Sequence, residues 1–226
     1  MKPGVESSVR PEPGRADPNL ILFDYDGVIA DTRSIFQQAF RNACAVFGLE
    51  HCAEDEAFLR IFEGNMIAGL SEAGLQETNR SHFLCVLKDR LSSLPRPRLF
   101  PGMRDVIVTL RRHFPLWIIT SNASDAVRPV LADADIAGCF TEIMGADFHP
   151  DKAEKIRMVR SRFPESFRAW YIGDTLGDIL EGERAGCHTV AVTWGWHTRD
   201  ILARGCPAYW AEYPEDLLRI LGINHS

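Results

Sequence analysis

The stretch LILFDYDGVIADT, residues 20–32, decides how the rest of the chain is interpreted. It starts with four apolar residues, which is typical of a buried strand, and continues into two carboxylates one residue apart, Asp24 and Asp26, before Gly27. In an open parallel sheet the carboxyl ends of the strands form the edge that binds ligands. Two acids at one such end concentrate negative charge, which is costly without a compensating cation. A divalent metal would compensate it, and oxygen ligands favour Mg²⁺.

Composition and charge limit the classes of function. The length of 226 residues and the apolar fraction of 46% suit one α/β domain with an insert, or two small domains. A net charge of -6 without a basic block argues against general binding to nucleic acid or to an acidic membrane surface. Six cysteines without CxxC spacing are interpreted as reduced packing residues, which favours the cytoplasm.

The sequence predicts no association with a membrane. No apolar run approaches the roughly 20 residues that a membrane span needs. Residues 1–18 lack the apolar core of a signal peptide and are rich in Pro, Gly, Ser and charge. We therefore expect residues 1–18 to be a disordered tail.

A helical insert is predicted directly after the first strand. Residues 33–94 contain no convincing strand, but apolar residues recur there at helical spacing in three or four stretches. The clearest stretches run from Ile35 to Phe47, from Phe58 to a break at Gly64, and from His82 to Leu94. The exit is marked by turn-forming residues, namely Pro95, Pro97, Pro101 and Gly102. We expect residues 33–94 to form a small helical domain.

Beyond the insert, strands and helices alternate. Helices are expected over 103–113, 124–134, 152–162 and 178–185, strands over 115–120, 141–144, 169–173 and 188–193, and then a short strand over 208–210 before a last helix. Alternation of this kind predicts an α/β fold with a doubly wound, parallel, Rossmann-like sheet. The expected sheet domain comprises 19–32 and 95–226, interrupted by the helical insert.

Polar residues follow two more of the predicted strands. Thr120, Ser121 and Asn122 end the strand over 115–120, and Asp174 and Asp178 follow the strand over 169–173. If these ends converge with residues 24–26, they form a pocket for one cation and one anionic ligand. Each segment also has a simpler interpretation. Residues 120–122 could do no more than cap the helix that begins near Ser124, and Asp178 could be no more than the N-cap of helix 178–185.

A lysine supplies the expected positive charge. Lys152 begins the predicted helix 152–162, where the helix dipole favours an anion over a cation. Its functional interpretation is a fixed charge that holds a carboxylate nucleophile and a bound phosphate together, and the alternative is an ordinary surface lysine. Lys155, one turn later, is the competing candidate.

Taken together, these segments resemble the phosphatases of the haloacid dehalogenase superfamily, in the branch with a helical cap inserted after the first strand. That branch includes the phosphoglycolate phosphatases and β-phosphoglucomutase. The resemblance covers roughly residues 20–222. FDYDGV (23–28) matches the family's DxDG(T/V) start, and GDTLGD (173–178) matches its GDxxxD. Thr120 matches the threonine or serine of the family's second motif-bearing strand end, and Lys152 matches the family's lysine.

The resemblance implies magnesium-dependent hydrolysis of a small phosphorylated metabolite through an aspartyl phosphate. Asp24 would attack phosphorus. Asp26 would protonate the leaving oxygen and then deprotonate the hydrolytic water. Mg²⁺ would be held by Asp24, the backbone carbonyl of Asp26 and Asp174, with Asp178 in support. The residues implied to bind the phosphoryl group are Thr120, Lys152, Gly27, Ser121 and Asn122. Both a monomer and a homodimer remain open.

Other reactions and functions fit less well. A dehalogenase of this superfamily lacks an acid two residues after its nucleophile, so Asp26 argues against it. A phosphonatase uses a cap lysine, but Lys88 is the only lysine in the insert and is far from the break at Gly64. A sugar-phosphate mutase carries a histidine in the helix where this chain has Phe36 or a neighbour. A phosphorylation receiver has no helical insert, and a silent binding protein is expected to have lost Asp24 or Asp26.

The choice of substrate is expected to depend on the cap. The break at residues 63–66 would place a loop over the site, where Arg33, Arg60 and Asn65 could contact the leaving group. For each of these three, solvated helix surface is the simpler interpretation. The segment from Trp194 to His197 either borders the site or forms a packed aromatic corner.

Overall fold

A six-stranded sheet forms the centre of the molecule. The computed structural model describes residues 19–63 and 66–223. The sheet order is β5-β4-β1-β6-β7-β8, and every neighbouring pair is parallel. Its strands are β1 (Asn19–Phe23), β4 (Leu116–Ile119), β5 (Glu142–Met144), β6 (Arg168–Gly173), β7 (His188–Val192) and β8 (Tyr209–Ala211). The predicted doubly wound parallel sheet is confirmed.

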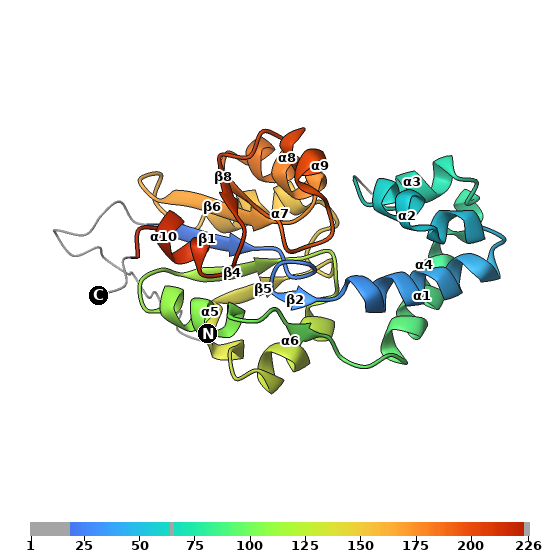
Figure 1. Cartoon of the computed structure of the whole chain (residues 1–226), viewed down its shortest axis with the longest axis horizontal. Helices are drawn as coiled ribbons and strands as arrows, with labels where there is room; N and C mark the ends of the chain where they lie inside the picture. The colour runs from blue at the N-terminus through green and yellow to red at the C-terminus, as the bar shows by residue number, and fades with distance from the viewer. Residues whose placement is uncertain (1–18, 64–65, 224–226) are drawn as a thin grey trace, which may run out of the picture.

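Helices cover both faces of this sheet (Figure 1). On one face lie α5 (Met103–Arg111), α6 (Ser124–Asp133) and α10 (Asp216–Ile220), and on the other α7 (Lys152–Arg160), α8 (Leu176–Arg184) and α9 (Arg199–Ala203). In β1, Ile21 and Phe23 pack into the first layer, and Leu20 and Leu22 into the second. Because both faces are buried, the strand is apolar without interruption.

The register of the central strands positions the site. Phe23, the last residue of β1, pairs with Ile118 of β4 on one side and Ile172 of β6 on the other. Since the three strands are parallel, the residues that follow them emerge side by side at one edge of the sheet. The predicted convergence of the strand ends is thus a consequence of the strand order.

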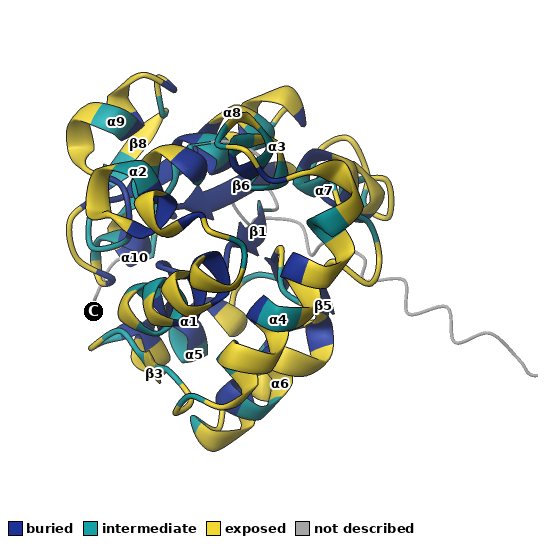
Figure 2. Cartoon of the chain, turned by 90° about the vertical axis from the view of Figure 1, so that its right-hand side faces the viewer, coloured by how far each residue is buried: buried dark blue, intermediate teal, exposed yellow. Residues whose placement is uncertain are grey.

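The insert after β1 is helical, as predicted. It contains α1 (Arg33–Val46), α2 (Asp55–Ile61), α3 (Met66–Glu72) and α4 (Arg80–Ser92), with short 3-10 helices at Glu50–Ala53 and Glu77–Asn79. These helices form a separate body beside the carboxyl end of the sheet (Figure 1) and stand in front of it in Figure 2. Their apolar core includes Phe40, Phe58, Leu70 and Phe83, together with Trp196 from the sheet domain. We call this body the cap.

Two connections join the cap to the sheet. They pair as a short antiparallel ribbon of β2 (Ala30–Asp31) and β3 (Arg98–Leu99), which the sequence pattern did not predict. A further 3-10 helix, Ala137–Cys139, precedes β5. The predicted tail, residues 1–18, lies outside the described residues. None of the helices that the structure describes is long and apolar enough to cross a membrane.

One helix boundary differs from the prediction in a way that matters for the site. Helix α8 begins at Leu176, two residues earlier than expected, and its N-cap is Thr175. Thr175 Oγ1 accepts a hydrogen bond from the Asp178 amide, and Asp178 Oδ2 accepts one from the Thr175 amide. This capping box makes Asp178 the third residue of the helix, so its interpretation as the N-cap is wrong.

Candidate active site

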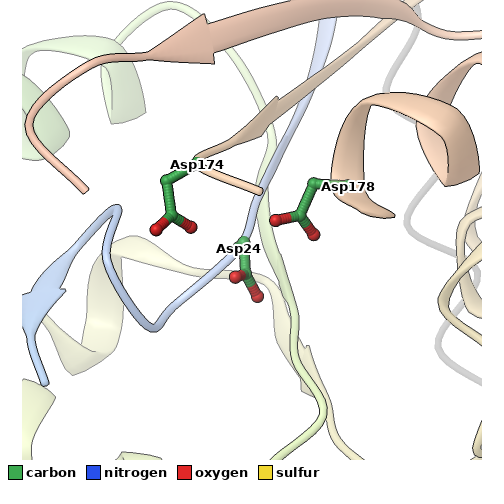
Figure 3. Close-up of side chains that lie close together, drawn as sticks. All are labelled: Asp24, Asp174 and Asp178. Carbon is green, nitrogen blue, oxygen red and sulfur yellow. The ribbon is translucent and has the colours of Figure 1, made fainter. Parts of the chain in front are cut away.

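Three carboxylates meet at the ends of β1 and β6 (Figure 3). Asp24 directly follows β1, Asp174 directly follows β6, and Asp178 projects from the first turn of α8. Each offers an oxygen, and these oxygens lie within 4.8 Å of one another. All three residues are buried, with at most 4% of any of them exposed. Three buried acids this close repel each other unless protons or cations compensate them.

Asp174 carries the clearest sign of a missing partner. Its Oδ2 accepts a hydrogen bond of 2.7 Å from the Trp196 amide, but its Oδ1 is buried and has no hydrogen-bond donor among the described residues. Burial and then the charges of Asp178 and Asp24 hold the pKa of Asp174 well above its usual value. A buried carboxylate oxygen without a donor is unfavourable in a folded protein, and a bound cation would satisfy it.

Asp178 is in the opposite situation. Its Oδ1 accepts from Lys152 Nζ at 2.7 Å and from the Tyr171 hydroxyl at 2.9 Å, and its Oδ2 accepts from the Thr175 hydroxyl at 2.6 Å. Burial by itself raises the pKa of Asp178, but the charge of Lys152 and these hydrogen bonds bring it below the usual value. Asp178 is therefore the stably ionised acid of the three.

Lys152 links the acids. Its Nζ lies 3.0 Å from Asp24 Oδ1 and 2.7 Å from Asp178 Oδ1. Burial lowers the pKa of Lys152, but Asp178 and Asp24 outweigh it, so the pKa is raised well above its usual value. Asp151 caps α7 by accepting from the Glu154 amide, which starts the helix at Lys152. Of the two lysines considered from the sequence, Lys152 is the one that faces Asp24.

The two leading acids have different surroundings. Burial raises the pKa of Asp24 to about 8, although Lys152 opposes the shift. Burial also raises the pKa of Asp26, to about 6, while the nearby Thr32 hydroxyl and the charge of Lys152 lower it. Asp26 Oδ2 accepts a 2.7 Å hydrogen bond from Asn122 Nδ2, which connects the end of β1 to the end of β4. A pKa near 6 suits a group that both gives and takes a proton.

The segment after β4 is fixed by hydrogen bonds but does not cap α6. Thr120 Oγ1 accepts from the Asn122 amide at 3.0 Å, and the Ser124 amide of α6 donates instead to Asp147 Oδ1 at 2.8 Å. The interpretation of residues 120–122 as mere helix caps is therefore wrong, because a distant aspartate has that role. The Ser121 amide donates to no acceptor within the described residues.

Gly27 allows the turn after Asp26 to approach Asp174. Its φ is +74°, and a Cβ there would lie 2.0 Å from Asp174 Oδ2. Any side chain at this position would displace the acid, which explains the glycine in physical terms. Gly195 is equally close, since a Cβ there would lie 2.3 Å from Asp174 Cβ.

The loop after β7 contributes to the site more than the sequence indicated. Besides the amide that binds Asp174, Trp196 inserts its indole into the cap, with ring centroids 5.4 Å from Phe36, 5.6 Å from Phe58 and 5.3 Å from Phe62. The two alternatives for residues 194–197 therefore hold together: the loop borders the site and packs as an aromatic corner. The WGWH sequence of residues 194–197 was the available signal, but it does not show which groups the amide and the ring of Trp196 contact.

The predicted cap residues are less informative. Arg60 is exposed and Arg33 is partly exposed, and neither makes a hydrogen bond or ion pair through its side chain within the described part of the chain. Asn65 and Gly64 lie outside the described residues. The ion pair between Glu63 Oε2 and Arg204 Nη1, at 2.8 Å, connects the end of the described α2 segment to the sheet domain.

Comparison with known proteins agrees with this geometry. The model of the family described as haloacid dehalogenase-like hydrolase matches residues 21–192. The chain belongs to the haloacid dehalogenase-like hydrolases. The sequence-based resemblance to this superfamily is thus confirmed, as is the classification as a hydrolase.

Two curated relatives and two solved structures illustrate the similarity. The phosphoglycolate phosphatase of Synechococcus elongatus is 30% identical over 88% of this chain and 95% of its own, and that of Yersinia pseudotuberculosis is 24% identical over 90% and 93%. A haloacid dehalogenase-like family protein from Streptococcus pneumoniae superimposes with a TM-score of 0.78, at 23% identity over 91% of this chain and 99% of its own. A predicted phosphoglycolate phosphatase from Haemophilus somnus gives 0.74, at 20% identity over 92% and 100%. The two structures support the fold.

Proposed function

We propose that this hydrolase is a magnesium-dependent phosphatase that cleaves a small phosphomonoester, phosphoglycolate-like or a sugar phosphate, through an aspartyl phosphate on Asp24. One observation carries the proposal. Asp24 is buried against Lys152, while Asp26, two residues later, is held by Asn122 and has a pKa of about 6. Such a pair separates a nucleophile from a proton carrier within one turn of chain.

The donor set fits a divalent cation. Asp174 Oδ1 is buried without a donor, and the carboxylates of Asp24 and Asp174 have raised pKa values that a nearby cation would bring down. Asp24, Asp174 and the Asp26 carbonyl would hold Mg²⁺. Asp178 would support the site from behind, because its oxygens already accept hydrogen bonds. When bound, the cation shields negative charge so that a phosphate dianion can approach the carboxylates.

Phosphoryl transfer to the protein is the first proposed step. A carboxylate oxygen of Asp24 attacks phosphorus, and the bond from phosphorus to the leaving oxygen breaks. Asp26 gives its proton to that oxygen, and Asn122 keeps the Asp26 carboxyl oriented by its hydrogen bond. The Lys152 ammonium and the unused donors at Thr120 and Ser121 bind the phosphoryl oxygens, whose charge is spread over the group in the transition state.

Hydrolysis of the intermediate is the second step. Asp26, now a carboxylate, takes a proton from a water molecule that attacks phosphorus, and the bond to Asp24 breaks to release inorganic phosphate. The nucleophile and the proton carrier are then restored. Lys152 stays bound to Asp178 throughout, so that its charge does not depend on the state of Asp24.

The substrate class is supported by the relatives. The curated proteins from Synechococcus and Yersinia are called phosphoglycolate phosphatases, which favours a small anionic phosphomonoester for this chain as well. The cap that faces the site is lined toward Trp196 by phenylalanines, which suits exclusion of water better than recognition of a large polar group.

The test is release of inorganic phosphate from a panel containing an aryl phosphate, phosphoglycolate and several sugar monophosphates. We expect turnover with Mg²⁺, its loss with a chelator and its return when Mg²⁺ is restored. The Asp24→Asn protein from the same preparation serves as the control for contaminating phosphatases. Undiminished turnover in the chelator contradicts the metal requirement. Formation of a sugar-phosphate isomer without free phosphate would instead support a mutase.

A further inference from the structure

Lys155 is a buried charge that the proposed mechanism does not use. Its side chain is fully buried on α7, one turn after Lys152. The hydrogen bond that Nζ makes within the described residues goes to the backbone carbonyl of Thr120, at 2.6 Å. Removing an ammonium group from water is costly, and a single carbonyl oxygen compensates only part of that cost. An apolar residue of similar length would satisfy the packing alone.

The contact is directed at one peptide group. The carbonyl of Thr120 and the amide of Ser121 belong to the same peptide bond. That amide donates to no acceptor within the described part of the chain. The Asn122 amide, in contrast, is used by Thr120 Oγ1 at 3.0 Å. The carbonyl oxygen of this peptide thus binds the Lys155 ammonium group, and its N–H remains available to a ligand.

The rest of the segment is held in place. The Asn122 carbonyl accepts from the Ala146 amide at 2.8 Å, and the Ser124 amide and hydroxyl both donate to Asp147 Oδ1. Thr120 itself is fixed to β5 through its amide, which donates to Met144 at 3.1 Å. The peptide between residues 120 and 121 therefore has little freedom to turn its N–H away from the site.

An ammonium group on the carbonyl oxygen also changes the peptide electronically. The peptide bond is a resonance hybrid, and a positive charge at the oxygen favours the form with less electron density on nitrogen. Hydrogen-bonded groups in a low-dielectric interior polarise each other in this way. The Ser121 N–H becomes a stronger donor, and preorganised donors of this kind stabilise charge that develops in a transition state.

We propose that Lys155 is a positioning residue for phosphoryl transfer, whose ammonium group fixes and polarises the Thr120–Ser121 peptide so that the Ser121 N–H binds a phosphoryl oxygen. The inference rests on the proposed phosphatase function and adds a residue to it. It also assigns different tasks to the two lysines of α7: Lys152 acts on the carboxylates, and Lys155 acts through the backbone.

The surroundings of Lys155 give the proposal a pH signature. Burial and the neighbouring charge of Lys152 lower the pKa of Lys155 to about 8, while Asp24, Glu181 and Asp147 oppose the shift. Above about pH 8 the ammonium is lost in a growing fraction of molecules. The polarisation of the Ser121 amide should disappear over the same range, and with it part of the activity.

The experiment compares Lys155→Met with Lys88→Met, an exposed lysine on α4 of the cap. Methionine has an unbranched side chain that ends one atom earlier, so the substitution leaves most of the buried chain in place and removes the ammonium group together with its hydrogen bond to Thr120. With Mg²⁺ and an aryl phosphate we expect kcat of Lys155→Met to fall by about 10–100-fold, less than the full loss of an oxyanion donor, and kcat of Lys88→Met to stay unchanged. The pH–rate profile of Lys155→Met should lack the wild-type decline centred near pH 8.

A second readout does not depend on activity. In ¹⁵N-labelled protein without ligand, the Ser121 amide proton should resonate upfield in Lys155→Met relative to wild type, and in wild type it should titrate with the Lys155 ammonium. This wild-type titration serves as the test if Lys155→Met fails to fold. The proposal is overturned if the Ser121 amide resonance responds neither to the Lys155→Met substitution nor to pH in the wild type. A folded Lys155→Met protein with wild-type kcat overturns it as well. A wild-type protein that hydrolyses no phosphomonoester but shows the Ser121 titration counts against the proposed function alone.

Discussion

The sheet domain and the cap are stabilised by different kinds of residue around one shared site. At the sheet edge, Asp24, Asp174 and Asp178 are buried together with Lys152, and their positions follow from strands that end side by side. The cap side of the boundary is aromatic. The rings of Phe36, Phe58 and Phe62 surround Trp196, with centroids at most 5.6 Å from the centroid of its ring. The sheet edge thus carries buried charge, and the cap side of the boundary is apolar.

This contrast predicts that substitutions on the two sides have opposite effects. Removing the charge of Asp24 or Asp26, whose pKa values burial raises, should reduce the rate while leaving the fold about as stable as before. Removing aromatic surface from the cap should reduce stability and change the choice of substrate while sparing the chemical step. The following variants test the contrast, beginning with the largest expected effect.

Asp24→Asn should abolish turnover, with a loss of about 10⁴-fold or more, because it removes the proposed nucleophile of the covalent intermediate. Trapping of the acyl phosphate with hydroxylamine should succeed with wild type and fail with the variant. Stability should not fall, since burial raises the pKa of Asp24 to about 8 and the neutral amide avoids that cost. A destabilised Asp24→Asn protein would mean that the carboxylate supports the fold, and would weaken the contrast.

Asp26→Asn should reduce kcat by about 10²–10⁴-fold on substrates with poor leaving groups, because it removes the proton carrier. The intermediate on Asp24 should still form from an aryl phosphate, whose leaving group needs little assistance, and should accumulate because its hydrolysis lacks a base. Rapid-quench measurement of the acyl phosphate checks this. An intermediate that fails to accumulate with the aryl phosphate contradicts the role of base.

The pKa of Asp26, raised to about 6 by burial, gives the sign of the pH dependence. With a poor leaving group the protonated form is needed, so kcat should fall as the pH rises above about 6. With an aryl phosphate the deprotonated form is needed for hydrolysis of the intermediate, so kcat should fall as the pH drops below about 6. A cation bound nearby moves both limits to lower pH without changing their directions. Both limits should be absent from the profiles of Asp26→Asn.

Trp196→Ala should affect the cap side. Truncating a buried tryptophan typically costs about 3–5 kcal/mol of unfolding free energy, and Trp196 is 5% exposed. The Trp196 amide still donates to Asp174 in the variant, so kcat on an aryl phosphate should change less than the KM for phosphoglycolate or a sugar phosphate. Denaturant unfolding and kinetics on both substrate classes measure this, with Tyr213→Ala, at a residue 67% exposed, as the matched control. A loss of kcat equal on every substrate would contradict the division between the two sides.

Much of the sheet edge could be predicted from the sequence because its determinants are local. Four apolar residues followed by Asp24 indicate a buried strand and its end, and parallel topology then brings the ends of β1, β4 and β6 together. The helical character of the insert was equally visible in its periodicity. The roles of the individual site residues, including the magnesium ligands, stay predictions until the variants are measured.

The features that sequence reasoning missed depend on contacts between distant segments. The ribbon of β2 and β3 has two residues in each strand, which is too short to show an alternating pattern. The Asp147 cap of α6 lies 23 residues from Ser124, so no local capping signal exists. Lys152 and Lys155 are three residues apart on one helix, and only the packing of α7 against the sheet decides which reaches Asp24 and which reaches Thr120.

The smallest effect is expected at the ionic contact between the two sides. Arg204 Nη1 lies 2.8 Å from Glu63 Oε2, but the arginine side chain is 56% exposed and that of Glu63 is 26% exposed. Exposed ion pairs contribute about 0–1 kcal/mol, because water and salt screen the charges and two long side chains must be ordered. Arg204→Ala should therefore lower the unfolding free energy by less than about 1 kcal/mol and change KM by less than about threefold. Comparison of Arg204→Ala with Trp196→Ala in the same denaturant and kinetic assays measures the difference. If Arg204→Ala lowered the unfolding free energy as much as Trp196→Ala does, the ion pair would stabilise the boundary as strongly as the aromatic contacts. The contrast between an ionic sheet edge and an apolar cap would then fail.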